Sequence, residues 1–93
     1  MNLKFTPQAI EDLERLKAFI AEKDINAARR IVGKLISKIE ILLQQPRMGR
    51  VVQDLEFCRD LIAQSYVIRY QIDDDTIWIL RLWHQKELRT EQP

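Results

Sequence analysis

The residues of this chain that are best suited to chemistry are one histidine, one cysteine and a group of basic side chains. His84 is the only side chain whose ordinary pKa lies near physiological pH, but no acid or nucleophile stands at a recognised spacing from it. A hydrogen-bonding role at a strand end is therefore favoured over catalysis. Cys58 is the only cysteine and lies in a strand-like pattern, so it is interpreted as a small core residue.

The sequence predicts no metal site and no cofactor. One cysteine and one histidine cannot supply the ligand sets that are typical of zinc sites. Gly33 and Gly49 stand alone, so there is no glycine-rich loop to hold a phosphate.

Basic side chains are concentrated in the second half of the chain, where a sheet is expected. Such a cluster suits the phosphates of RNA or an acidic protein segment. The formal net charge is only +1, so any basic surface must be local. The members of the cluster are Arg47, Arg50, Arg59, Arg69, Arg81, Lys86 and Arg89.

The composition is that of one small folded domain, residues 1–93. Hydrophobic residues make up 46% of the chain and charged residues 31%, enough to form a core without metals or crosslinks. A single cysteine is typical of a reducing cytosol. The start of the chain lacks the pattern of a signal peptide, and no apolar stretch reaches membrane-spanning length, so a soluble, cytoplasmic protein is expected.

An amphipathic helix is predicted after a short extended segment at residues 2–5. Thr6 and Pro7 are typical of a helix start, because the hydroxyl can cap free N–H groups and the proline ring presets φ. Apolar residues then recur at steps of three and four positions to about Lys23, which places them on one face.

A second amphipathic helix is predicted to follow a short charged connection. Asp24 or Asn26 can cap its start. It should end just before Pro46, because the residue before a proline is disfavoured in the helical conformation. Two such helices with a short connection favour an antiparallel hairpin that needs an apolar surface to cover.

The apolar periodicity changes from helical to strand-like near Val51. Strands are predicted at 57–63, 67–72 and 76–84, with the acidic residues 73–75 as the last turn. The expected architecture is therefore α+β, with the helical hairpin packed on one face of a twisted antiparallel sheet.

The apolar pattern also predicts a register for the last hairpin, since a shift of one residue would exchange the two faces. A three-residue loop pairs Ile72 with Thr76, Tyr70 with Trp78, and Ile68 with Leu80. The face predicted to meet the helices is then Ile68, Tyr70, Ile72, Trp78, Leu80 and Leu82.

The other face of this hairpin combines apolar side chains with two arginines. An apolar patch of this kind, if exposed, typically marks a partner site, and the arginines would suit a partner that carries carboxylates. The alternative is that other elements cover the face and each arginine pairs with Asp60, Asp73 or Glu87. The residues predicted on this face are Val67, Arg69, Gln71, Ile77, Ile79, Arg81 and Trp83.

Four short motifs, in their order along nearly the whole chain, resemble the RelE/ParE superfamily of bacterial type II toxins. They are the turn with Leu42, Pro46, Gly49 and Arg50; the strand start Arg59, Asp60 and Leu61; Tyr66 to Tyr70; and Ile79 to His84. The resemblance implies a β-α-α-β-β-β order. It also implies a cognate antitoxin that wraps around the toxin and neutralises it, in a complex that represses its own operon and contacts operator DNA only through the antitoxin.

Two branches of the superfamily differ in target. RelE-like members resemble small ribonucleases that cut mRNA in the ribosome, whereas ParE-like members, associated with plasmid stabilisation, inhibit DNA gyrase. Val67 follows Tyr66 where the RNA-cutting branch typically has arginine, and Asp60 falls where that branch has a basic residue. These departures favour the ParE-like branch, although Arg59, Arg69, Arg81 and His84 could form an alternative catalytic set.

The resulting hypothesis is a ParE-like toxin that causes growth arrest through gyrase, with two alternatives: a RelE-like ribosome-dependent endonuclease, and a non-toxic binding module that keeps the fold. The predicted contacts with gyrase or another target are His84, Lys86 and Arg89. The predicted contacts with the antitoxin are Val67, Arg69, Ile77, Ile79, Arg81 and Trp83.

Overall fold

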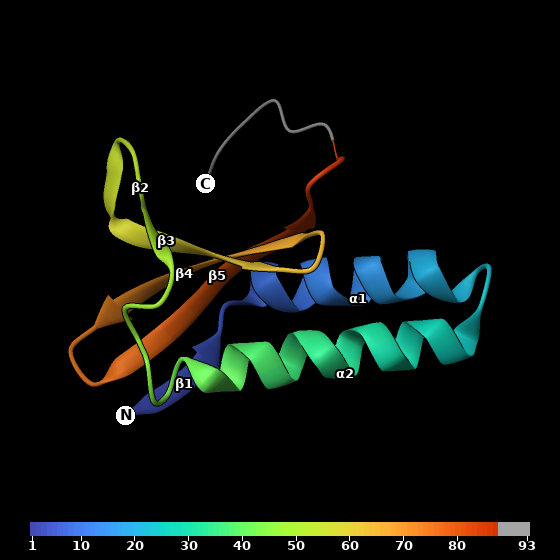
Figure 1. Ribbon diagram of the computed structural model, residues 1–93, viewed down its shortest axis with the longest axis horizontal. Helices are drawn as coiled ribbons and strands as arrows, with labels where there is room; N and C mark the ends of the chain where they lie inside the picture. The colour runs from blue at the N-terminus through green and yellow to red at the C-terminus, as the bar shows by residue number, and fades with distance from the viewer. Residues whose placement is uncertain (88–93) are drawn as a thin grey trace.

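Two helices pack side by side on one face of a five-stranded sheet in the computed structural model, which describes residues 1–87 (Figure 1). The predicted α+β class is confirmed. In chain order the elements are β1 (Asn2–Phe5), α1 (Pro7–Ala21), α2 (Ile25–Ile41), β2 (Arg50–Val52), β3 (Leu55–Ala63), β4 (Tyr66–Asp73) and β5 (Thr76–His84). None of the described helices is long and apolar enough to cross a membrane.

Both helices begin at the predicted caps. The Thr6 hydroxyl accepts a hydrogen bond from the Ala9 N–H at 3.1 Å, and Pro7 is the first residue of α1. The Asp24 carboxylate caps α2 by accepting from the N–H groups of Asn26 and Ala27. The chain therefore reverses between two well-capped helices, as a helical hairpin requires.

The sheet is mixed and has one strand more than the sequence predicted. Its order is β1-β5-β4-β3-β2, and β1 runs parallel to β5, whereas every other neighbouring pair is antiparallel. The short strand β2 extends the sheet beyond β3. Thr6, just past β1, donates from its hydroxyl to the Leu80 carbonyl at 3.0 Å, so α1 starts directly against β5.

The β4–β5 register differs from the predicted one, which was wrong by one residue at the turn. Asp73 pairs with Thr76, so the turn contains only Asp74 and Asp75, and Asp74 adopts the positive φ (58°) that so tight a turn requires. A second shift follows further along the hairpin, where Tyr70 pairs with Ile79 but Arg69 pairs with Arg81. Leu80 is therefore the extra residue of a β-bulge.

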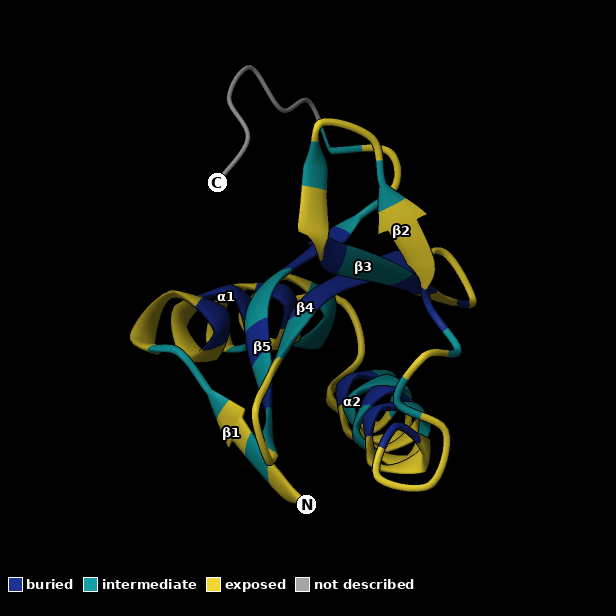
Figure 2. Cartoon of the chain, turned by 90° about the vertical axis from the view of Figure 1, so that its left-hand side faces the viewer, coloured by how far each residue is buried: buried dark blue, intermediate teal, exposed yellow. Residues whose placement is uncertain are grey.

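The register decides which residues form the core. Ile77 and Ile79 face the helices and are fully buried, so they are not on the partner face where the sequence placed them. Trp78 is displaced to the opposite face for the same reason. The bulge restores the original alternation, so Leu82 is buried in the core and Trp83 lies on the outer face. Figure 2 shows buried residues along β4 and β5 beside the two helices.

Tyr70 fixes the segment that leads from α2 into the sheet. Its hydroxyl donates to the Pro46 carbonyl at 2.7 Å and accepts from the Gly49 N–H at 2.8 Å. The ring is fully buried, and burial raises the pKa of the phenol despite the Gly49 hydrogen bond. The Pro and Gly of the predicted turn are thus held by one side chain from the middle of the sheet.

Candidate functional site

The outer face of the sheet, turned away from both helices, is the first candidate site. Ile62 pairs with Val67, and Val67 pairs with Trp83, so these three apolar side chains form one row across β3, β4 and β5. Ile62 is 47% exposed, whereas Val67 and Trp83 are largely buried. The row places the predicted Val67 and Trp83 together and adds Ile62, which the sequence did not single out.

Arg69 lies next to this row and carries an internal counter-charge. Its Nε donates to Asp60 Oδ1 at 2.8 Å and its Nη2 to Asp60 Oδ2 at 3.0 Å, which is a two-point ion pair across β3 and β4. The guanidinium also lies over the Trp83 ring, with Cζ of Arg69 5.1 Å from the ring centroid. The hydrogen bonds to Asp60 raise the pKa of Arg69, which keeps its charge.

Arg81 pairs with a carboxylate on α1. Its Nε lies 2.8 Å from Asp12 Oδ2, and the same carboxylate accepts the Leu82 N–H at 3.0 Å. Arg15 also bonds the Asp12 carboxylate. Burial works to raise the pKa of Asp12, but the hydrogen bonds from Arg81 and Leu82 outweigh it, and the pKa is lowered.

Both arginines thus already hold internal carboxylates, and their pairing with a partner's carboxylates stays a prediction. Asp60 was among the internal partners considered from the sequence, but Asp12 was not. It lies 69 positions from Arg81, and only the packing of α1 against β5 brings the two together.

The alternative catalytic set is not assembled as one site. Arg59 is bound to the carbonyl oxygens of Gly49 at 2.8 Å and Arg47 at 3.2 Å. Because it pairs with the core residue Tyr70, it lies on the face opposite Arg69, the partner of Asp60.

His84 is the last residue of β5 and pairs with Tyr66, four positions along β4 from Tyr70, the partner of Arg59. Its ring is perpendicular to that of Tyr66, with the two ring centroids 5.0 Å apart, and its Nδ1 accepts a hydrogen bond from the N–H of Lys86 at 3.0 Å. Arg69 and Arg81 are thus cross-strand neighbours, whereas Arg59 and His84 are not on their face of the sheet. His84 makes a hydrogen bond, the role that the sequence favoured.

A hollow beside His84 is the second candidate site. It has a volume of about 600 Å³ between α1 and the end of β5 and is mostly apolar, with an ion pair between Arg15 and Glu87 at its side. Phe19 contributes a side chain that is 65% exposed. The residues that line it are Arg15, Leu16, Phe19, Ile20, Tyr66, His84, Lys86 and Glu87.

Two of the three predicted target contacts, His84 and Lys86, therefore lie together at one hollow, and Arg89 lies outside the described residues. Phe19 was missed by sequence reasoning. The sequence did contain a sign of it. Phe19 is a large aromatic residue of the first helix that lies beside the apolar stripe and not in it, so it was not part of the predicted core.

Neither a reactive cysteine nor a metal site is found in the described part of the chain. Cys58 is 2% exposed, and its burial raises the pKa of the thiol, so the nucleophilic thiolate is disfavoured. Among residues 1–87, no group of three or more His, Cys, Asp or Glu side chains is placed to hold a metal ion.

Residues 3–89 match the family described as ParE toxin of type II toxin-antitoxin system, parDE. Two curated relatives come from Caulobacter vibrioides. Toxin RelE1 is 31% identical over 88% of this chain and 90% of its own length, and toxin RelE3 is 28% identical over 95% and 98%.

Solved structures have the same fold. A chain of the chromosomal ParDE system from P. aeruginosa matches with a TM-score of 0.78 at 20% identity, covering 90% of this chain and 95% of its own. A chain of the RelBE2 toxin-antitoxin complex from Mycobacterium tuberculosis matches with a TM-score of 0.69 at 23% identity, covering 92% of both chains.

Proposed function

The chain belongs to the ParE toxin family of type II toxin-antitoxin systems, within the RelE/ParE superfamily, and from this membership we propose that it arrests growth by binding DNA gyrase and not by cutting RNA. The supporting observation is that Arg69 and Arg81 each hold an internal carboxylate. A ribonuclease needs cations aimed at the charge that develops on phosphate in the transition state. Here those charges stabilise the toxin's own fold.

Two positions of the central strands support the same proposal. Val67 is 7% exposed and lies where the RNA-cutting branch typically has arginine. An arginine side chain at this position would not fit between Ile62 and Trp83 and would have to point away from them. Asp60 replaces a typically basic residue with the counter-charge of Arg69. Both substitutions remove positive charge from the place where RNA would be cut.

We assign the gyrase contact to the hollow beside His84. An exposed aromatic next to a mostly apolar hollow is the kind of surface that protein partners bury, and Lys86 adds a cation at its edge. Gyrase and the toxin would meet in the cytoplasm.

The antitoxin is assigned to the outer face of the sheet. Ile62 offers exposed apolar area there, continuous with Val67 and Trp83, while Arg69 holds the Trp83 ring in place from one side. Ile77 and Ile79 are removed from the predicted set because they belong to the core. The antitoxin is thus expected to contribute apolar anchors, with its carboxylates less important than the sequence implied.

A specific observation favours the first alternative, a RelE-like mRNA endonuclease: the two Caulobacter relatives are named RelE. Supercoiling by purified gyrase and the mapping of mRNA ends on translating ribosomes separate the two activities. We expect gyrase to be inhibited and the mRNA to stay intact. Unaffected gyrase together with codon-phased cuts would overturn the proposal.

The second alternative, a binding module without toxicity, requires a test in cells. Expression in bacteria without an antitoxin should stop growth, and co-expression of the antitoxin encoded beside the toxin should restore it. Normal growth from a well-expressed, folded protein would favour the non-toxic module.

A further inference from the structure

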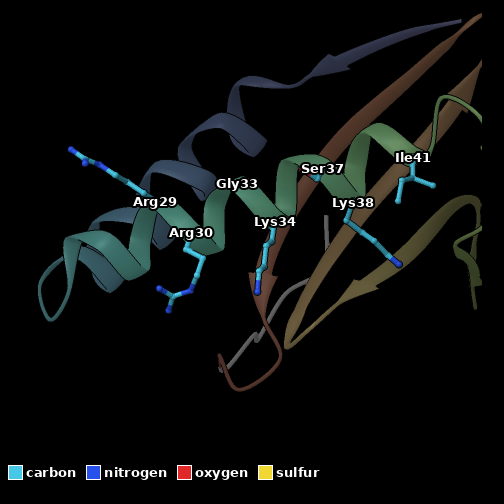
Figure 3. A pocket seen from close by; sticks show the side chains of 7 residues that line it. All are labelled: Arg29, Arg30, Gly33, Lys34, Ser37, Lys38 and Ile41. Atoms are coloured by element: carbon cyan, nitrogen blue, oxygen red, sulfur yellow. The ribbon is translucent and has the colours of Figure 1, made fainter.

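Helix α2 carries a row of cations that belongs to neither of the two sites above, although the hollow at its end also borders Ile62. In Figure 3, Arg30, Lys34 and Lys38 point to the same side of the helix, whereas Arg29 points away from them. Successive members of the row are four positions apart, which gives each a rotation of only about 40° from the last. We refer to Arg30, Lys34 and Lys38 as the α2 basic row.

The two hollows beside the row are lined by basic, apolar and uncharged polar residues of the described chain, with no acidic side chain among them. One shallow hollow lies along α2 with Gly33, Ser37 and Ile41, and the other is shared with the β3–β4 turn. Within residues 1–87, no ion pair involves any cation of the row. Glu40 is two positions beyond Lys38, about 200° around the helix, and so belongs to another side.

This charge is local in a chain that is nearly neutral. The net charge is only +1, so the row creates a positive surface that the whole molecule does not have. In the sequence the row is three cations at positions 30, 34 and 38, and it is distinct from the basic cluster of the second half of the chain. The structure separates the two, because Arg59, Arg69 and Arg81 of that cluster are bound to backbone or carboxylate oxygens elsewhere in the fold.

We propose that the α2 basic row binds the phosphate backbone of duplex DNA without sequence preference, a direct contact in addition to the operator recognition that the resemblance assigns to the antitoxin. The rise of an α-helix puts its cations about 6 Å apart and spreads them over about 12 Å. Duplex DNA carries one charge per about 1.7 Å of axis, so about seven phosphates fall within that length. A straight row of cations on a rigid helix is attracted most strongly by a straight, dense row of anions.

The composition of the surface argues against other occupants. Proteins that bind single-stranded nucleic acid stack its bases on aromatic side chains, and no aromatic residue lines either hollow beside the row. An acidic peptide would need apolar anchor pockets to bind specifically. Ile41 is the one large apolar side chain in the hollow along α2, and the second hollow adds only Ile62 beside the buried Leu35. The proposal does not depend on gyrase inhibition, because it concerns a different face.

Fluorescence anisotropy with a labelled 20-base-pair duplex of mixed sequence tests the proposal on the full-length chain. Three phosphate contacts predict a slope of about −2.7 in log K against log salt concentration. The double variant Lys34→Glu/Lys38→Glu should weaken binding at least tenfold at low salt and reduce the slope by about two. The control Lys17→Glu/Lys23→Glu, on exposed positions of α1 and its following turn, changes the net charge equally and should stay within twofold of the wild type.

Gly33 offers a second pair of variants that leaves every cation in place. A side chain there meets nothing within 4 Å, so Gly33→Glu adds a negative charge beside the row without a clash. It should weaken DNA binding several-fold, whereas the uncharged Gly33→Gln should not.

Several results would overturn the proposal. Equal losses in the two double variants would show that only net charge matters. Tighter binding of a single-stranded RNA of the same length, or displacement by polyglutamate as effective as by unlabelled duplex, would identify a different occupant. Gyrase inhibition is measured separately, so the failure of one proposal leaves the other standing.

Discussion

The carboxylate of Asp12 on α1 lies 2.8 Å from Nε of Arg81 on β5, although the two residues are 69 positions apart in the chain. The parallel strand β1 ends at Phe5, opposite Ile79, and beyond that point no strand formed by residues 1–87 lies beside β5 on this edge. Asp12 takes over there, because it accepts the Leu82 N–H that a strand would otherwise bind. This contact therefore joins the helical layer to the sheet edge.

Asp12→Asn should destabilise the protein by about 2 kcal/mol, because Arg81 would lose its counter-charge in a largely buried contact. The amide can still accept from Leu82, so the loss comes mainly from the ion pair. Urea unfolding at pH 7 measures it. Glu11→Gln, an exposed neighbour on the same helix, is the control and should change stability by less than about 0.5 kcal/mol.

The same ion pair predicts how stability depends on pH. The pKa of Asp12 is lowered in the folded protein, so its stabilising effect is complete above the unfolded pKa of about 3.9 and is lost as pH falls through the lower, folded pKa. The stability difference between wild type and Asp12→Asn should be constant from pH 7 to 5 and shrink below pH 4. A difference that stays the same down to pH 3 would show that the ion pair is not its source.

Tyr70→Phe should cost about 1 to 3 kcal/mol. The variant leaves the Pro46 carbonyl and the buried Gly49 N–H without the hydroxyl that both now share. Thermal or urea unfolding measures the loss. An unchanged midpoint would mean that water replaces the hydroxyl.

Gly49→Ala should also destabilise the protein, because it disturbs the contact between Tyr70 and Gly49. A Cβ at this position would lie 2.6 Å from Cε1 of Tyr70, so the buried ring would have to move. Gly33→Ala is the matched control, since it meets no neighbour and lies inside α2. It should stabilise the protein by about 0.5 to 1 kcal/mol.

Ile62→Glu should weaken antitoxin binding at least tenfold if the antitoxin covers the outer face of the sheet. Ile62 is half exposed, so the free toxin should keep its stability. Titration calorimetry with the purified antitoxin measures the affinity. Ile25→Glu, an equally apolar and exposed position at the start of α2, should bind normally.

Trp83→Ala addresses the same interface at its aromatic anchor. We expect a loss of about 2 kcal/mol or more in binding, as for hot-spot aromatics. Because Trp83 also stacks on Arg69, the unfolding midpoint of the variant must be measured alongside. Unchanged affinity in a folded variant would show that the antitoxin binds elsewhere.

Phe19→Ser should raise the concentration needed for half-inhibition of gyrase at least tenfold, because it removes the exposed aromatic beside the hollow. Ile10→Ser is the control, since Ile10 is a half-exposed apolar residue of the same helix that does not line the hollow. A supercoiling assay compares them. Equal inhibition by all three proteins would move the gyrase contact to another surface.

Sequence patterns identified the local structure well, because each signal acts over a few residues. Thr6 with Pro7, and Asp24, start the helices by bonding N–H groups within one turn. Three of the strands lie within a few residues of their predicted positions. The three-residue strand β2 was not predicted as a separate element, because so short a segment has little periodicity of its own.

Local patterns could not predict which residues of β4 and β5 face the helices. The apolar residues of β5 are so dense that both registers give a plausible core, and the choice rests on a two-residue turn and a bulge at Leu80. One residue of difference sent Ile77 and Ile79 into the core and Trp78 out of it.

The sequence by itself thus determined the helical hairpin, the strand segments and the family motifs, which are encoded by neighbouring residues. Only the tertiary structure decided which side chains face outward and which carboxylate neutralises each arginine. Those outcomes depend on contacts between distant elements, such as Asp12 with Arg81, whose energies appear only once α1 has packed against the sheet.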